Sequence, residues 1–227
     1  MVLRRANFRL RLNLDVFRAG FRYATKAYVV ALLGFLLLRA NVFLLERLAG
    51  AAELGQYSIA AQIGDVLTVL PSSVALVLFP RLVAEEEVRW TMLLRNVKMT
   101  AFLIVAICVF SAIVVSPVIR LVFGAEFAAA VPMLLFLLPG IVLLAVSTIL
   151  SQYLAARGLP VGLVGVWAAA LATGVVGSLL LIPSAGGVGA SIGLSGAYAV
   201  LLIGVVALTV MERNRELMPG GFQQKPA

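Results

Sequence analysis

The sequence predicts an all-α polytopic membrane bundle of six transmembrane helices with both termini in the cytoplasm. Of its 227 residues, 63% are hydrophobic and 12% are charged, whereas soluble domains average roughly 45–50% and about 25%. This composition excludes a soluble globular domain. The apolar runs are continuous over helical lengths and do not alternate, so outer-membrane β-strands are excluded as well.

The residue types also exclude most enzyme chemistry. The chain has no histidine and only one cysteine, Cys108, so it has neither a Cys/His zinc cluster nor a Ser-His-Asp or Cys-His triad. Three consecutive glutamates, Glu85 to Glu87, spread around a helix and cannot converge on one metal ion. We therefore expect no catalysis, no metal and no cofactor.

The first 26 residues contain seven basic residues and one acid, Asp15, and no apolar run begins before Ala27. A cleavable signal peptide would need an earlier apolar core, so that interpretation is rejected. A nucleic-acid-binding arm is disfavoured because a membrane span follows. Residues 1–26 are predicted to be a basic cytoplasmic or interfacial segment.

A bilayer core requires about 20 mostly apolar residues per helix. Six segments meet this requirement: residues 27–48, 54–79, 99–119, 127–154, 159–182 and 188–211. Residues 212–227 form a cytoplasmic tail after the last span. Lys and Arg are distributed fifteen to two between the two sides of these spans. The excess places both termini in the cytoplasm, as expected for a multi-pass inner-membrane protein.

The connector that follows the second span carries Glu85 to Glu87 and then an amphipathic stretch from Val88 to Val97. This pattern predicts a short separate helix with Trp90 at headgroup depth. An interfacial strut is favoured over a gating linker. In the last span, Gly189 and Gly193 are spaced for close helix packing.

Polar residues within the spans suggest a cavity. Five of them recur at helical spacing in the second span, so they share one face: Ser58, Gln62, Asp65, Thr68 and Ser72. Arg39 in the first span and Asp65 in the second lie roughly 14 and 16 Å deep at about 1.5 Å per residue. We expect these two residues to form an ion pair that lines a hydrated cavity.

The alternative is a buried salt bridge that only fixes helix register. Asn41 lies two residues from Arg39, about 200° around the helix, so both side chains cannot point straight into one narrow cleft. Another polar face occurs near the cytoplasmic end of the fourth span, where Gln152 is a further candidate for the cavity.

Several motifs together resemble the C-terminal half of Wzx-like polysaccharide-biosynthesis flippases of the multidrug/oligosaccharidyl-lipid/polysaccharide exporter superfamily. The resemblance covers roughly residues 20–211. The most informative fragments are residues 21–28 (FRYATKAY), 38–45 (LRANVFLL), 55–60 (GQYSIA), 121–127 (LVFGAEF), 138–140 (LPG) and 156–160 (ARGLP). The family usually has Arg-x-Asp where this chain has Arg39-x-Asn41, and it has about twice as many helices.

The resemblance implies translocation of oligosaccharides linked to undecaprenyl diphosphate across the cytoplasmic membrane. For such a substrate, the polar residues within the spans are the candidates for the substrate cavity, and two basic residues at the cytoplasmic rim are the candidates for headgroup capture. The cavity candidates are Arg39, Asn41, Ser58, Gln62, Asp65 and Gln152, and the rim candidates are Lys26 and Arg157. The expected partners are the bilayer, the lipid-linked oligosaccharide, and either a missing N-terminal half or a second copy, with no nucleic acid. Two alternatives remain open: a non-transporting membrane scaffold and an ion-coupled drug exporter of the same superfamily.

Overall fold

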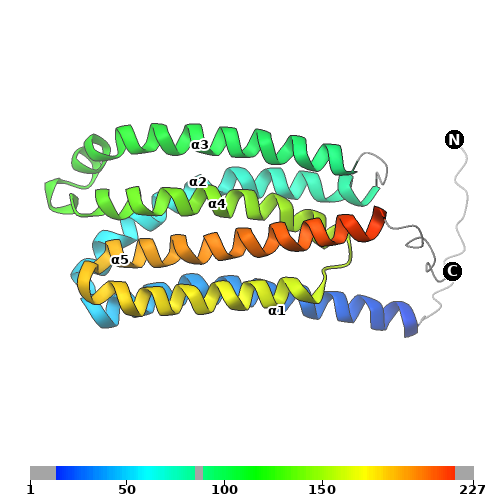
Figure 1. Ribbon diagram of the computed structural model, residues 1–227. Helices are drawn as coiled ribbons and strands as arrows, with labels where there is room; N and C mark the ends of the chain where they lie inside the picture. The colour runs from blue at the N-terminus through cyan, green and yellow to red at the C-terminus, as the bar shows by residue number, and fades with distance from the viewer. Residues whose placement is uncertain (1–13, 85–88, 218–227) are drawn as a thin grey trace, which may run out of the picture.

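The computed structural model describes residues 14–84 and 89–217, and within these ranges every regular element is helical. The predicted all-α class is confirmed. The elements are α1 (Leu14–Ala49), α2 (Ala51–Ala84), α3 (Arg89–Val122), the short 3₁₀ helix η1 (Ala125–Phe127), α4 (Ala130–Ala156) and α5 (Val161–Leu217). In the described ranges, five helices are long and apolar enough to cross a membrane. They pack side by side as one elongated bundle (Figure 1).

α5 is interrupted at Gly186, where the backbone leaves the helical conformation and bends sharply. This residue has φ 54° and ψ −133°, a conformation that glycine adopts readily and other residues rarely do. The chain reverses direction there (Figure 1). α5 therefore consists of two helical arms, residues 161–185 and 187–217, which correspond to the fifth and sixth predicted segments.

The helices turn back at the two ends of the bundle through short connections. At one end lie Gly50, η1 and Gly186; at the other lie the ends of α2 and α4, the starts of α1 and α3, and the end of α5 (Figure 1). We call the second of these the basic end, because it carries Lys26, Arg81, Arg157 and Arg213. Both ends of the described chain lie at this end of the bundle (Figure 1).

Glycine is required at two of the turns. Gly50 (φ 87°) separates α1 from α2 by a single residue, and Gly158 (φ 87°) precedes Leu159, which itself has φ 60°. At the Gly186 bend, the carboxylate Oε1 of Glu53 accepts a hydrogen bond of 2.8 Å from the backbone N–H of Gly187. Glu53 thus links the start of α2 to the start of the second arm of α5.

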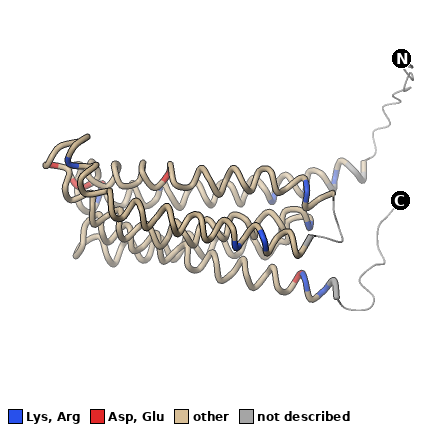
Figure 2. The backbone as a smooth tube through the Cα atoms, turned by 90° about the horizontal axis from the view of Figure 1, so that it is seen from above, with Lys and Arg blue, Asp and Glu red and all other residues tan. Residues whose placement is uncertain are grey.

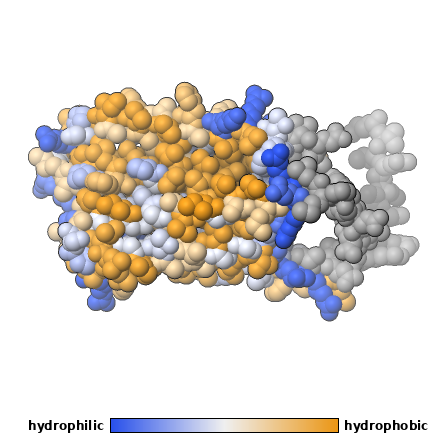
Figure 3. Space-filling model, in the orientation of Figure 1, coloured by the Kyte–Doolittle hydropathy of each residue, from blue (hydrophilic) through white to orange (hydrophobic). Residues whose placement is uncertain are grey.

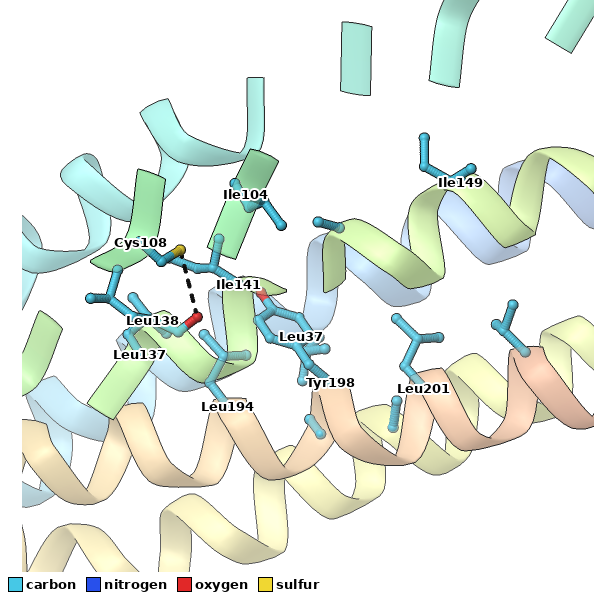
Figure 4. Packing of buried hydrophobic residues seen from close by; sticks show 14 of the residues in the cluster. Leu37, Ile104, Cys108, Leu137, Leu138, Ile141, Ile149, Leu194, Tyr198 and Leu201 are labelled. Carbon is cyan, nitrogen blue, oxygen red and sulfur yellow. Dashed lines mark hydrogen bonds between the residues drawn. The ribbon is translucent and has the colours of Figure 1, made fainter. Parts of the chain in front are cut away.

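α4 is the central helix. Of its most apolar stretch, 56% is buried, compared with 17–33% for the other helices. Figure 4 shows Leu137 and Ile141 of α4 facing Leu194 and Tyr198 of α5, with Cys108 of α3 on another side. The core is therefore built around α4, which packs against α2, α3 and α5, whereas α1 packs chiefly against α5.

The two arms of α5 approach each other closely through small residues. A Cβ atom on Gly177 would lie 3.2 Å from the Cα of Gly193. This confirms that Gly193 belongs to a packing seam, as its spacing from Gly189 predicted.

The outer surface of the bundle is apolar along most of its length (Figure 3). Phe102, Leu121 and Leu76 are 78%, 87% and 77% exposed, which would be costly in water but is favourable against lipid. Lys and Arg gather mainly toward the two ends (Figure 2). This distribution matches the hydrocarbon and headgroup zones of a bilayer.

The helices extend farther toward the basic end than the predicted spans do. α1 begins at Leu14, so the second half of the basic segment 1–26 is part of this helix, and residues 1–13 lie outside the described residues. α3 runs without a break from Arg89, so the predicted separate helix up to Val97 is wrong. The glutamates at 85–87 also lie outside the described residues.

Candidate functional site

A cavity of about 230 Å³ opens between α1, α2, α4 and the second arm of α5. Its walls are mainly apolar, with aromatic rings from Phe35, Tyr57 and Tyr198. Two charged side chains, Arg39 and Asp65, also line it. The volume is sufficient for several water molecules, and both charges lie in the middle part of their helices.

Arg39 and Asp65 thus line one cavity, as their depths predicted. They do not form the predicted ion pair: between described side chains, the one salt bridge present is Arg215–Glu212 at 3.0 Å. The Arg39 guanidinium instead lies 5.3 Å from the centroid of the Phe35 ring, one turn back on α1. Both charged side chains are exposed, so each can be hydrated separately.

The two residues also do not lie at equal depth along their helices. Arg39 is ten residues before the end of α1 at Ala49, whereas Asp65 is fourteen residues after the start of α2 at Ala51. At about 1.5 Å per residue, the two positions therefore differ by about 6 Å along the helices.

Asn41 does not line the cavity. It is 4% exposed, and its side-chain amide is the centre of a buried hydrogen-bond network. Nδ2 donates to the Tyr57 hydroxyl at 2.7 Å and to the Ala190 carbonyl at 3.5 Å, while Oδ1 accepts from the Ser178 hydroxyl at 2.9 Å. This Asn41 network joins α1, α2 and both arms of α5 directly behind the cavity wall.

The polar stripe of α2 divides among several environments. Asp65 and Thr68 line the cavity, whereas Gln62 is exposed outside it. Ser58 is half-buried and donates to the carbonyl of Leu54 in its own helix at 2.7 Å. Ser58 and Gln62 are therefore neighbours of the cavity and not part of its wall.

Gln152 lies in a different hollow, of about 300 Å³, between α2 and α4. Ser72, Phe79 and Thr148 line this hollow with it. Gln152 thus lies closer to the basic end than the cavity does and is separate from it.

The two residues predicted to capture a headgroup meet at the turn between α4 and α5. Lys26 Nζ donates to the carbonyls of Gly158 and Leu159 at 2.8 and 2.6 Å. The adjacent Arg157 has its guanidinium 5.3 Å from the centroid of the Tyr153 ring. Lys26 therefore holds the turn that carries Arg157, and both lie at the basic end.

Tyr57 was missed as a cavity residue by the sequence reasoning. A signal was present, because positions 57, 61, 64 and 68 follow the heptad spacing of one helix face, and all four line the cavity. The prediction relied instead on the polar residues of α2, which lie on a neighbouring face of the helix that overlaps this one only in part.

Long apolar helices that reverse at both ends of the bundle around a charged inner cavity define a multi-pass membrane protein. The chain belongs to the family of polysaccharide biosynthesis proteins, because the model of that family matches residues 1–132, more than half of the chain. The match agrees with the flippase resemblance and includes both charged cavity residues. No curated protein and no solved structure matches the chain.

Proposed function

We propose that the protein takes part in translocating oligosaccharides linked to undecaprenyl diphosphate across the cytoplasmic membrane. The observation that carries this proposal is Arg39, a cation in the middle of a long apolar helix whose side chain lines a cavity. A charged residue at this depth is costly in lipid and is tolerated where it meets protein, water or a ligand. The substrate would supply the compensating anion.

The chemistry of the cavity suits the two parts of such a headgroup. An arginine fork binds phosphate oxygens through parallel hydrogen bonds. Asp65 and the Thr68 hydroxyl, on the facing helix, can accept hydrogen bonds from sugar hydroxyl groups. Phe35, which also lines the cavity and is 54% exposed, provides an aromatic surface of the kind that packs against sugar rings.

The proposed topology places six spans in the inner membrane, with the two arms of α5 as the last two. The basic end then faces the cytoplasm, consistent with the excess of Lys and Arg there. Arg157 and Lys26 would meet the diphosphate before it enters the cavity. Movement of the substrate across the membrane would then require a conformational change of the bundle and no covalent step.

A complete substrate path requires a second wall. Gln62, Asp65 and Ser72 on α2 are all exposed, although Asp65 lines the cavity and Ser72 the hollow beside it. Contact of these polar side chains with lipid would be unfavourable. We propose that an N-terminal half or a second copy of the chain faces them and closes the path.

The cavity also bears on the two alternatives. A scaffold would have Asp65 packed against other helices, whereas Asp65 is exposed and lines a cavity. A drug exporter for cations would present an excess of acidic groups, whereas this cavity has one cation and one anion. The first observation favours transport over a scaffold, and the second does not favour a cationic substrate.

The test is a chromosomal Arg39→Ala substitution, followed by measurement of surface polysaccharide and of accumulated lipid-linked precursor. Loss of a charged hydrogen bond of about 1.5–3 kcal/mol predicts export reduced roughly 10- to 150-fold. Arg47→Ala is the matched control, because Arg47 lies 5.4 Å from the Phe43 centroid in the same i−4 geometry but outside the cavity. Normal export by Arg39→Ala, at normal protein levels, would refute the proposal.

A further inference from the structure

Another groove lies between α2 and α3, on the outside of the bundle, and has polar side chains at one of its ends. Its volume is about 350 Å³. Its walls are formed by four apolar side chains, those of Val74, Val77, Leu78 and Met99. Two polar side chains, those of Arg81 and Asn96, lie toward the basic end. The groove therefore has a long apolar part and a short cationic part.

The length and direction of the groove suit a lipid chain. From Ser73 to Arg81 is eight residues, about 12 Å along the helix. Arg81 lies three residues before the end of α2, at the level of the basic end, while Ser73 lies deeper. The Ser73 hydroxyl donates to the carbonyl of Val69 in its own helix at 2.8 Å, so it adds little polarity to the deep part.

Arg81 is available to an external anion. Its side chain is exposed, and none of the carboxylates among residues 14–84 and 89–217 forms a salt bridge with it. Asn96, opposite it on α3, donates to the carbonyl of Met92 at 2.8 Å through Nδ2, which has a second hydrogen for another acceptor. Together the two side chains offer a cation and an amide donor at headgroup level.

The groove is separate from the Arg39 cavity. At 100° per residue, the α2 positions that line the groove, such as 77 and 81, lie on roughly the opposite side of the helix from cavity positions 57, 61 and 68. A lipid in the groove would therefore have α2 between its chain and the cavity. A resident lipid fits this position better than a substrate in transit.

We propose that this groove between α2 and α3 binds one acyl chain of an anionic glycerophospholipid, with the phosphate on Arg81 and Asn96. Charge complementarity selects the headgroup, and the apolar walls hold the chain. The lipid would fill the space between two helices and so stabilise their packing. The inference does not depend on which substrate the protein moves.

The experiment measures lipid binding to the purified full chain by native mass spectrometry. Phosphatidylglycerol and phosphatidylcholine with identical acyl chains are the probes. A cation near a membrane surface contributes about 1 kcal/mol toward anionic lipid, so we expect about fivefold tighter binding of phosphatidylglycerol. Arg81→Ala should abolish this preference, whereas Arg95→Ala, an exposed basic residue outside the groove, should retain it.

A second pair of variants tests the apolar part. Val77→Trp fills the groove and should weaken binding of both lipids, whereas Val69→Trp makes the same change at an exposed position of α2 outside both this groove and the Gln152 hollow and should not. Circular dichroism and a monodisperse elution profile establish that each variant is folded. Equal loss in Arg81→Ala and Arg95→Ala, no effect of Val77→Trp, or tighter binding of a polyprenyl phosphate than of phosphatidylglycerol would each overturn the assignment.

Discussion

The Asn41 network makes a quantitative prediction about stability. Asn41→Ala removes the two short hydrogen bonds, of 2.7 and 2.9 Å, to the hydroxyl groups of Tyr57 and Ser178. Both partners are nearly inaccessible, at 2% and 1% exposure, so water cannot replace the lost amide. The substitution therefore leaves two buried hydroxyl groups with weaker partners.

The expected magnitude follows from these two bonds. A buried polar group left without a partner costs about 1–3 kcal/mol, although interhelical hydrogen bonds in membranes average only about 0.6 kcal/mol and reach about 1.7. For two such bonds we expect a loss of about 2–3 kcal/mol in the free energy of unfolding. The ratio of folded to unfolded protein should fall roughly 30- to 150-fold.

The assay is equilibrium unfolding in mixed micelles of dodecyl maltoside and sodium dodecyl sulfate, followed by circular dichroism. Thr173→Ala is the control, because the Thr173 hydroxyl is exposed and donates only within its own helix, to Ala169 at 2.9 Å. It should change the free energy of unfolding by less than about 0.5 kcal/mol. A double-mutant cycle between Asn41→Ala and Tyr57→Phe should give a coupling of about 1 kcal/mol. Unfolding of Asn41→Ala within 0.5 kcal/mol of wild type would refute the reasoning.

Three further substitutions test the packing. Gly140→Ala should destabilise the bundle by about 1–3 kcal/mol in the same assay, because its Cβ would lie 2.8 Å from the Cα of Ser195; an unchanged unfolding curve would contradict this crossing of α4 and α5. Lys26→Met should cost about 1 kcal/mol and increase hydrogen exchange at the α4–α5 turn, since two carbonyls lose their donor. Trp90→Leu should cost about 1–2 kcal/mol, because the Arg213 guanidinium lies 4.3 Å from the Trp90 ring centroid. Adding Arg213→Ala to Trp90→Leu should then lower the free energy of unfolding little further. If the effects of the two substitutions were fully additive, this contact would be excluded.

The fold was largely predictable because helices in a membrane are specified by long apolar runs and short glycine turns. Hydropathy, however, indicates which residues lie in the bilayer core and does not indicate how far a helix continues beyond it. α1 and α3 therefore begin earlier than the spans predicted, at Leu14 and Arg89, through sequence that is too charged for the bilayer core but compatible with helix. The bend at Gly186 was predicted as a longer break, because Gly186 lies within a run of five small or helix-breaking residues, 183–187.

The site was predictable in depth but not in detail. The rise per residue correctly placed Arg39 and Asp65 on one cavity, since depth depends on the backbone alone. Whether the charged atoms meet depends on the side-chain conformations, and Arg39 lies over the Phe35 ring, a contact that spacing between helices does not encode. The 200° separation of Arg39 and Asn41 was also correct, but it did not indicate which of the two faces the core.

The Asn41 network gives a physical reason for an amide where the flippases that this chain resembles usually have an aspartate. The position is buried and lies 3.5 Å from the carbonyl oxygen of Ala190. An ionised carboxylate there would face that oxygen without a hydrogen to share and would require a buried counter-ion. The amide donates to Tyr57 and accepts from Ser178 at the same time, so the network is satisfied while neutral. The charge of Arg39, two residues away, can then remain on the cavity and does not have to compensate a buried carboxylate.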